Sequence, residues 1–496
     1  MSTPDAVVVG AGPNGLAAAI TLARAGRSVH VLERADAVGG AARTAETTLP
    51  GLRHDLGSAV HPFGVTSPAF TAWPLAAHGL RWLHPPTPLA HPLDDAPAAT
   101  LAADLDATAD ALGADADAWR FLTGPATRDL GRLAPDVLGP LLRWPASPVA
   151  LARFGVRGLP PAAWPARALR TDAARALWAG LAAHAALPFG APATSAPALL
   201  LAAMGQRVGW PFPRGGAGAL ADALAAYLTS LGGRVTTGVE VRDLRDLPPA
   251  PVRLLDVTPA TFLRLAGPER LPAGYVRALR RYRPGEGVVK LDLAVEGGVP
   301  WSDPAVHAAG TVHLGGRFEA IRTAEADVAA GRLPAEPYVL VAQAGRFDAS
   351  RRAGDLEPVW AYAHLPRRRV GDGAAVRTLA ARIVEQLERA APGLRARVRA
   401  ERTWGPVDLA ADNPNLVGGD VANGAPTLRQ LVVRPNLARV PYATPLPGTY
   451  LCSAATPPGP GVHGMAGVRA AEAALRWDSA RTASGAPGTR AARPPR

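Results

Sequence analysis

The chain has 496 residues, 48% of them hydrophobic, and a formal net charge of +12 at pH 7. This length exceeds what one hydrophobic core usually organises, so we expect two domains, which can be interleaved along the chain. Cys452 is the only cysteine, which excludes an intrachain disulfide, a C-x-x-C redox centre and a thiolate metal site; we predict no metal. The first strand begins too early for a leader, and no apolar run free of charges and prolines could span a membrane. We therefore expect a cytoplasmic protein.

The positive charge does not predict a nucleic-acid partner. Of the 53 basic residues, all except Lys290 are arginines, and they are scattered along a chain that is also rich in Gly, Pro and Ala. No basic stripe or aromatic-interleaved basic motif occurs, which a nucleic-acid interface would require. A biased composition explains the charge, and we expect no nucleic acid.

The first 33 residues carry the strongest motif. Four apolar residues, 6–9, predict a buried strand, and the turn 10–15 reads Gly-Ala-Gly-Pro-Asn-Gly. A helical pattern follows, then a second β run over 28–32 that ends at Glu33. Strand, glycine-rich turn, helix, strand and acid in this order form the dinucleotide-binding fingerprint. Glu33 is placed to accept hydrogen bonds from a ribose 2′-hydroxyl, which argues against a 2′-phosphate.

Each residue of the turn has a predicted role. Gly10 permits the tight turn, Gly12 lets the backbone approach a pyrophosphate, and Gly15 lets the helix pack closely on the strand. Pro13 suits the first helical turn, and Asn14 follows it. The pyrophosphate is expected on the free N–H groups of this helix N-terminus.

Two further segments are predicted to reach the same cofactor. Arg34 follows the ribose acid, and Gly39-Gly40 with Arg43 forms a second glycine-containing loop that flavoproteins often have. Gly57-Ser58 is a small pair that can lie against a flat ring. His61 either faces that ring or bonds locally, and local bonding is the commoner case for a histidine.

Residues 76–204 have a different pattern. They consist mostly of Ala/Leu-rich helical sequence broken by prolines, with tryptophans and arginines between apolar residues, and they predict a helical cap over a substrate site. The segment 130–170 has two interpretations. One is ordinary helix packing; the other is peripheral contact with a membrane or an apolar substrate, because basic residues beside Trp and Leu suit a membrane interface.

From about residue 205 the chain returns to the dinucleotide domain. A helix is predicted over 217–230, a strand over 234–237, and a further β segment over 239–244. In this segment Val241 is expected to pair its backbone with adenine, because proteins with this fingerprint commonly do so at the matching position. Another strand is expected over 254–257. From about residue 286 the alternation of apolar residues predicts a second sheet with one covered face, an amphipathic helix over 374–391 and a polar loop over 408–423.

The C-terminal motif closes the predicted fold. A strand over 450–453 leads into a stiff glycine- and proline-rich loop, and Val462, His463, Gly464 and Met465 then open a helix that runs to Trp477. A glycine-rich loop at a helix N-terminus can hold negative charge at the N1/C2=O edge of a flavin. The tail after Asp478 is expected to be disordered.

These motifs resemble the phytoene-desaturase-like branch of the FAD-dependent amine oxidase superfamily, in the subgroup of the pyridine nucleotide-disulfide oxidoreductase domain-containing proteins. The matching segments are 10–15, 39–43, 408–420, 448–452 and 462–467. One departure is Ala454-Ala455, where family members commonly carry an acid.

The resemblance implies an α/β fold with a discontinuous Rossmann-type βαβ domain that binds FAD non-covalently, an inserted helical cap and a mixed-sheet substrate domain. We expect the FAD-binding domain at 1–75, 205–285 and 435–478, the substrate and cap domain at 76–204 and 286–434, and a disordered basic tail at 479–496.

The resemblance also implies a function. The expected activity is dehydrogenation of an apolar small molecule by hydride transfer to flavin N5. An oxygen-dependent amine oxidase, a flavin-dependent isomerase and a non-catalytic flavin-binding regulator remain as alternatives, although the C-terminal motif offers no aromatic cage for an amine.

Lys290 is the one candidate catalytic residue. It is the single lysine that this arginine-rich chain retains, and lysine differs from arginine in its compact charge and its ability to lose a proton when buried. By resemblance it holds a water near flavin N5. The alternative is a structural residue at a place where arginine would clash.

Overall fold

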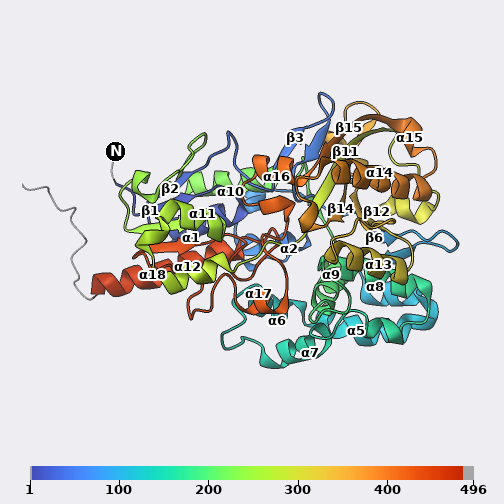
Figure 1. Cartoon of the computed structure of the whole chain (residues 1–496), viewed down its shortest axis with the longest axis horizontal. Coiled ribbons are helices and arrows are strands. Elements are labelled where there is room, and N and C mark those ends of the chain that lie inside the picture. Colours follow the sequence, from blue (N-terminus) through green and yellow to red (C-terminus); the bar gives the residue numbers. More distant parts are fainter. Residues whose placement is uncertain (1–2, 484–496) are drawn as a thin grey trace, which may run out of the picture.

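A parallel five-stranded sheet joins three separated parts of the chain in the computed structural model, which describes residues 3–483 (Figure 1). The strand order is β16-β10-β1-β2-β9, and every pair is parallel. The strands are β1 (Ala6–Val9), β2 (Val29–Leu32), β9 (Arg234–Thr236), β10 (Val252–Leu255) and β16 (Thr449–Leu451). The carboxyl ends of β1, β2 and β10 therefore meet at one edge, where α/β sheets bind ligands.

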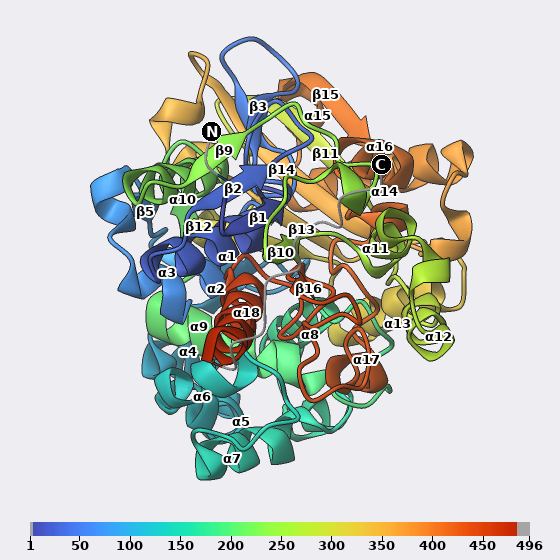
Figure 2. The same ribbon diagram turned by 90° about the vertical axis from the view of Figure 1, so that its left-hand side faces the viewer.

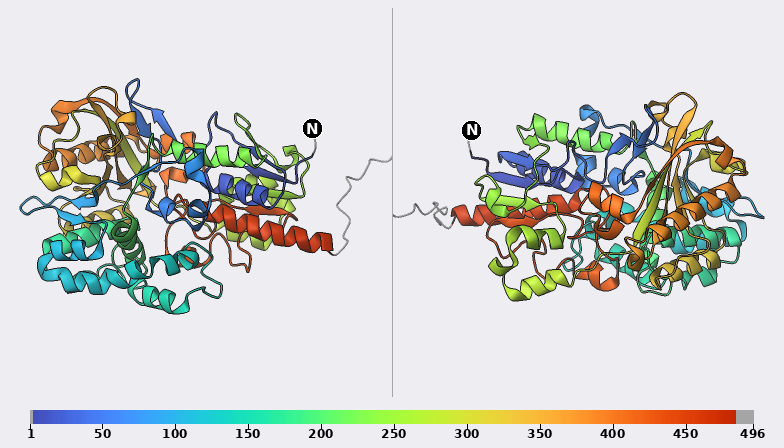
Figure 3. Two further views of the ribbon diagram at one scale, coloured as in Figure 1. Left: turned by 180° about the vertical axis from the view of Figure 1, so that it is seen from behind. Right: turned by 45° about the horizontal axis from the view of Figure 1, so that its top comes forward.

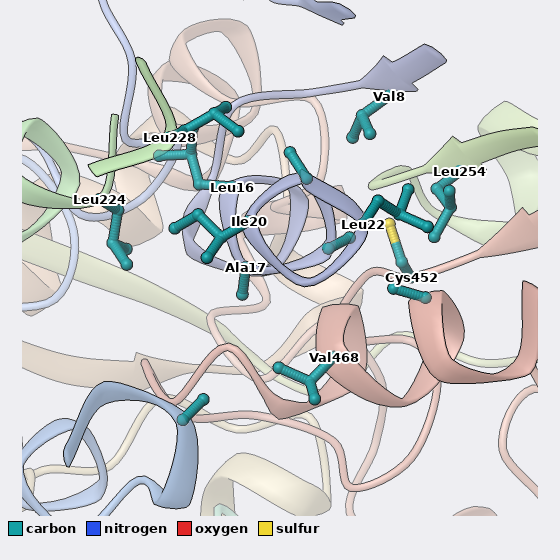
Figure 4. Close-up of a cluster of buried hydrophobic side chains, with 14 of the residues drawn as sticks. Val8, Leu16, Ala17, Ile20, Leu22, Leu224, Leu228, Leu254, Cys452 and Val468 are labelled. Carbon is teal, nitrogen blue, oxygen red and sulfur yellow. The ribbon is translucent and has the colours of Figure 1, made fainter. Parts of the chain in front are cut away.

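Helix α1 (Pro13–Arg24) is the centre of this half of the molecule. Leu16, Ile20 and Leu22 are buried between the sheet and two covering helices, α10 (Gly218–Ser230) and α18 (Met465–Ala483), as Figure 4 shows. In both views of Figure 3 the red helix α18 runs beside the blue N-terminal segment. The helices touch closely: a Cβ on Gly467 would lie 1.8 Å from the backbone oxygen of Asn14. Helix α18 thus packs directly against the glycine-rich turn at residues 10–15.

A second, mixed sheet of seven strands forms the other half, in the order β15-β11-β14-β13-β12-β6-β7. The register places Lys290 of β11 opposite both Tyr362 of β14 and Trp404 of β15. Helix α14 (Gly373–Ala390) packs on the other face through Val289 and Leu291. The strands are β6 (Thr87–His91), β7 (Ala99–Leu101), β11 (Gly287–Glu296), β12 (Ala309–Leu314), β13 (Val339–Ala342), β14 (Leu356–Leu365) and β15 (Val398–Trp404).

Helices cover the Lys290 face of the second sheet and form the lower part of the molecule in Figures 1 and 2. They are α5 (Ala116–Arg128), α6 (Leu130–Val137), α7 (Pro148–Gly158), α8 (Asp172–Ala183) and α9 (Ser195–Val208). Their core includes Trp119, Trp178 and Trp210. No helix within residues 3–483 is long and apolar enough to cross a membrane.

Smaller elements complete the fold. The strands are β3 (Thr44–Glu46), β4 (Arg53–Asp55), β5 (Trp82–Leu83) and β8 (Phe212–Pro213). The helices are α2 (Pro62–Val65), α3 (Pro68–Ala72), α4 (Leu105–Ala111), α11 (Pro259–Ala266), α12 (Ala273–Arg280), α13 (Phe318–Ala329), α15 (Leu394–Arg397), α16 (Pro406–Asp412) and α17 (Leu428–Val432).

The α/β fold class is confirmed, but three local predictions were wrong. Residues 76–204 are mostly helical as expected, and they also contribute β6 and β7, which join the second sheet. The expected polar loop begins as α16, whose N-terminal Gly405 N–H donates to Asp408. No strand covers 239–244. The predicted tail starts as the last turns of α18, and its remainder, 484–496, lies outside the described residues.

Candidate functional site

Glu33 lines a cleft at the carboxyl ends of β1 and β2. Its Oε2 accepts the N–H of Ala11 at 2.7 Å, and its Oε1 accepts the N–H of Ala35 at 2.8 Å. Each carboxylate oxygen keeps a second acceptor position for a ligand hydroxyl. Residues predicted to bind a cofactor line this cleft together: Gly10, Gly12, Glu33, Arg34, Gly40, Arg43 and Val241.

The glycines of the cleft leave room for a ligand and for no side chain. A Cβ on Gly40 would lie 3.2 Å from the Cα of Gly12, so two backbones face each other there. Gly39 and Gly40 both have positive φ, +118° and +55°. A Cβ on Gly15 would meet the Gly10 oxygen at 2.0 Å, which is the close helix–strand packing the fingerprint requires.

Asp256 is a residue of this cleft that sequence reasoning missed. It follows β10, and its Oδ2 accepts the N–H of Gly15 at 3.0 Å, at the N-terminal end of α1. Burial raises the pKa of Asp256 to about 7; the Gly15 hydrogen bond lowers it in part, and the charge of Glu33 raises it further. The sequence feature that could have identified it is an acid at the carboxyl end of a strand beside β1, which is where such sheets bind ligands.

The segment 412–415 closes the cleft from the other half of the molecule. Asp412 pairs with Arg43, and its backbone oxygen accepts Arg34 Nη2 at 2.7 Å. Asn415 donates from Nδ2 to the Asp256 backbone oxygen at 2.8 Å. The predicted Arg34 and Arg43 therefore lie at the cleft and hold the segment that covers it.

The small pair Gly57-Ser58 lies beyond the cleft, on the segment that follows β4. A Cβ on Gly57 would meet the Ala41 oxygen at 2.3 Å, so only glycine fits. Ser58 Oγ and His61 Nε2 are 3.1 Å apart, which is the local bond expected for His61. Burial lowers the pKa of His61 to about 4, and its Nδ1 has no partner among the described residues.

The segment Val462–Met465 lies against the start of α1. Gly464 has a φ of +70°, and a Cβ there would meet Ala17 at 2.8 Å. His463 is fully buried; its Nδ1 accepts the N–H of Met465 at 3.0 Å, and burial lowers its pKa to about 4. Asn14, opposite this segment, has a buried side-chain oxygen with no partner among residues 3–483. A polar ligand along α1 would satisfy that atom.

Lys290 belongs to a buried polar cluster. Its Nζ donates to Asp292 Oδ1 at 2.6 Å, and Asp292 Oδ2 accepts both Thr47 Oγ1 and Trp404 Nε1 at 2.8 Å. Burial lowers the pKa of Lys290, and Asp292 opposes that shift. Thr47 lies on the hairpin between Arg43 and Gly57. The cluster therefore contacts the hairpin that joins two predicted cofactor-binding segments, although Lys290 does not line the cleft itself.

Lys290 also shares a sheet face with aromatic and histidine side chains. The register aligns Lys290, Tyr362, Leu340 and His313 across four strands, on the face opposite α14. On this face Trp360 and Tyr362 pack edge to face, with ring centroids 5.1 Å apart. Trp360 Nε1 and Tyr338 Oη are buried and have no hydrogen-bond partner among the described residues.

Arg434 is a second residue that the sequence did not identify. It is 1% exposed, and its Nε donates to the Ala454 backbone oxygen at 2.9 Å. Its Nη2 bonds the backbone oxygens of Ala422 and Asn423, and its Nη1 has no partner in residues 3–483. The resemblance led us to expect an acid at Ala454-Ala455, but the structure has the buried guanidinium of Arg434 beside Ala454. A guanidinium there favours an anionic ligand group over a hydroxyl.

The chain is similar to known proteins in sequence and in fold. Residues 8–78 match the NAD(P)-binding Rossmann-like domain model. The chain is 26% identical to mouse pyridine nucleotide-disulfide oxidoreductase domain-containing protein 2, over 95% of this chain and 93% of the mouse protein. An oxidoreductase from Methanosarcina mazei has a TM-score of 0.63 at 16% identity, covering 95% of this chain and 99% of that one. Cyclohexylamine oxidase from Brevibacterium oxydans has a TM-score of 0.59 at 16% identity, covering 97% and 100%.

The predicted resemblance is confirmed. Its curated relatives include pyridine nucleotide-disulfide oxidoreductase domain-containing proteins, and its fold is similar to that of cyclohexylamine oxidase.

Proposed function

We propose that this protein is an FAD-dependent oxidoreductase that dehydrogenates an apolar small molecule. The observation that carries the proposal is the cleft in which Glu33, the facing backbones of Gly12 and Gly40, and the N-terminus of α1 converge. Glu33 would bind the ribose of FAD, the α1 N-terminus its pyrophosphate, and Val241 its adenine. Bound FAD would accept a hydride from the substrate at N5.

A dithiol mechanism does not fit this chain. The homologue's name refers to disulfide oxidoreductases, but Cys452 is the only cysteine here and is fully buried. Burial also raises the pKa of the Cys452 thiol well above its usual value, so the nucleophilic thiolate is disfavoured. The proposed electron transfer would therefore use bound FAD and not a dithiol.

The substrate is proposed to lie on the Lys290 face of the second sheet, beneath the cap helices. Apolar side chains of the cap and sheet, including Trp178, Trp210 and Leu340, form one core that extends to Trp360 and Tyr362. Such surroundings favour a largely hydrocarbon substrate, because polar groups would lose their hydration there. Lys290, held by Asp292, would keep a proton or a water positioned beside that substrate.

A second candidate is an amine oxidase. The Trp360–Tyr362 pair favours this activity, because aromatic faces attract ammonium groups. One protein of similar fold is named cyclohexylamine oxidase. The C-terminal motif contributes no aromatic ring to such a cage, so dehydrogenation of an apolar substrate remains the first choice.

Anaerobic titration tests the proposal. FAD-loaded protein is mixed with polyene hydrocarbons or with primary amines, and flavin absorbance is followed. Bleaching by the hydrocarbons alone supports the dehydrogenase, and bleaching by amines alone supports the amine oxidase. Product formation without bleaching would instead indicate an isomerase, and no effect of any substrate would favour a non-catalytic flavin-binding protein.

A further inference from the structure

The cap carries an unusual concentration of exposed apolar side chains. Of the sixteen large hydrophobic side chains exposed within residues 3–483, eight lie between positions 121 and 164. Trp144 is 88% exposed, Val156 74% and Phe121 72%. We call these eight residues the apolar rim: Phe121, Leu141, Leu142, Trp144, Val149, Val156, Leu159 and Trp164. Exposed apolar groups gathered in this way mark an interaction surface.

A basic groove lies next to the rim, between α5, α6 and α7. We call it the arginine groove; its lining residues are Pro125, Arg128, Asp129, Arg132, Arg153 and Arg157. Asp129 is its single acid, with Arg132 Nη1 at 3.5 Å and Arg153 Nη1 at 3.8 Å. The lining holds four guanidinium groups and one carboxylate, so three positive charges remain without a lining acid to balance them.

The two features belong to one surface. On α7, Val149, Arg153 and Val156 are spaced to share a helix face, and all three are exposed. The guanidinium of Arg157 lies 5.0 Å from the centroid of the Phe121 ring, which joins α7 to α5. Figures 1 and 2 both place α5, α6 and α7 along one outer edge of the molecule, away from β1 and β2.

We infer that the apolar rim and the arginine groove dock the protein on the surface of an anionic phospholipid membrane. Guanidinium groups bind phosphodiesters with two parallel hydrogen bonds, and tryptophan favours the boundary between headgroups and acyl chains. A second copy of this chain would bring the same positive groove and be repelled. The docking does not depend on the FAD chemistry proposed above.

Vesicle flotation of the FAD-loaded full chain tests the inference. The vesicles contain phosphatidylcholine alone or with phosphatidylglycerol, at about 0.1 M and about 1 M salt, where the Debye length falls from about 10 Å to about 3 Å. We expect flotation with the phosphatidylglycerol vesicles at the lower salt and loss of most of it at the higher salt. Phosphatidylcholine alone should recover little protein.

Three double variants sharpen the test. Arg153→Gln with Arg157→Gln should weaken partitioning about 30-fold, since each basic residue near the surface contributes about fivefold. Trp144→Ser with Val156→Ser should weaken it at both salt concentrations. Arg395→Gln with Arg397→Gln removes the same charge from the exposed helix α15, far from the groove in Figure 1, and should bind as the parent does.

Flavin content and circular dichroism verify that each variant is folded. Failure of the parent protein to float with anionic vesicles would overturn the inference. It would also be overturned if the α15 control lost as much binding as the groove variant. Binding to polyglutamate without binding to vesicles would identify an acidic protein as the partner and equally contradict a membrane.

Discussion

The carboxyl group of Asp256 accepts a hydrogen bond from the backbone N–H of Gly15, with Oδ2 and the nitrogen 3.0 Å apart. The contact joins the strand β10 to the helix N-terminus at which a pyrophosphate is expected. A Cβ on Gly12 would lie 2.9 Å from the same carboxyl oxygen. The acid thus lies at the place where the pyrophosphate of the proposed FAD would bind.

FAD affinity should therefore depend on the protonation of Asp256. Burial raises the pKa of this carboxyl to about 7, so it is neutral below that pH and negative above it. The negative form repels the pyrophosphate. We expect the FAD dissociation constant to rise up to about tenfold per pH unit above about pH 7. Asp256→Asn should flatten this dependence, as measured by flavin fluorescence; an unchanged pH profile would show that Asp256 does not face the phosphates.

Replacing Lys290 should destabilise the protein, because its ion-pair partner Asp292 is buried. Lys290→Met leaves the carboxylate of Asp292 buried without its cation, which costs about 3–5 kcal/mol. Adding Asp292→Asn should restore much of that stability in urea unfolding. Lys290→Arg tests the space available, since a wider cation has to fit between Asp292 and Trp404.

The catalytic role of Lys290 is a separate expectation. If Lys290 positions a proton or a water, folded FAD-loaded variants should reduce or reoxidise the flavin about a hundredfold more slowly in stopped-flow measurements. Stability loss with flavin kinetics within about twofold of the parent would make Lys290 a structural residue.

The buried pair of His364 and Glu325 should make stability pH-dependent. Nδ1 and Oε1 are 2.9 Å apart. Burial lowers the pKa of His364, but the charge and hydrogen bond of Glu325 outweigh it and the pKa is raised. A raised histidine pKa stabilises the fold fully below the ordinary value of about 6.5, and the gain is lost as the pH rises through the raised pKa.

The matched measurement compares two variants of helix α13. The parent should exceed Glu325→Gln in unfolding free energy by about 3–5 kcal/mol below about pH 6.5, and by less at higher pH. Glu319→Gln removes an exposed charge from the same helix and should cost at most about 1 kcal/mol at any pH. Equal effects of the two variants would contradict the buried pair.

Close packing of α18 on α1 should make Gly467 sensitive to a single methyl group. Gly467→Ala places a Cβ 1.8 Å from the Asn14 oxygen, so we expect a loss of at least about 1–3 kcal/mol and weaker FAD binding. Gly131→Ala is the control, because Gly131 is exposed in α6 with no atom within 4 Å. It should be neutral or stabilising by up to about 1 kcal/mol. Thermal unfolding of both proteins distinguishes the two positions.

The sequence predicted the elements whose signals are local. Residues 6–9 are uniformly apolar and directly precede the glycine turn, so β1, α1 and β2 follow from neighbouring residues. The strands β6 and β7 were missed because β6 pairs with β12, more than 200 residues away, and β7 pairs in turn with β6. Local Ala/Leu content gives no indication of such distant pairing.

Prediction of the site from the sequence was limited in the same way, to residues with a local signal. Glu33 and Gly40 were found from spacing alone, and the structure places both in the cleft. Asp256 was missed because its role depends on β10 lying beside β1. Asp292 could have been found, since it lies two residues from Lys290 and so on the same face of one strand. Arg434 has no sequence signal, because its partners come from two distant loops.

The flavin content of the purified protein tests the central claim most directly. Acid precipitation should release equimolar FAD into solution from the parent protein, and Gly12→Val, which fills the space between Gly12, Gly40 and Asp256, should purify without flavin. A parent protein that remains colourless after incubation with FAD, or a Gly12→Val variant that purifies as yellow as the parent, would contradict the account.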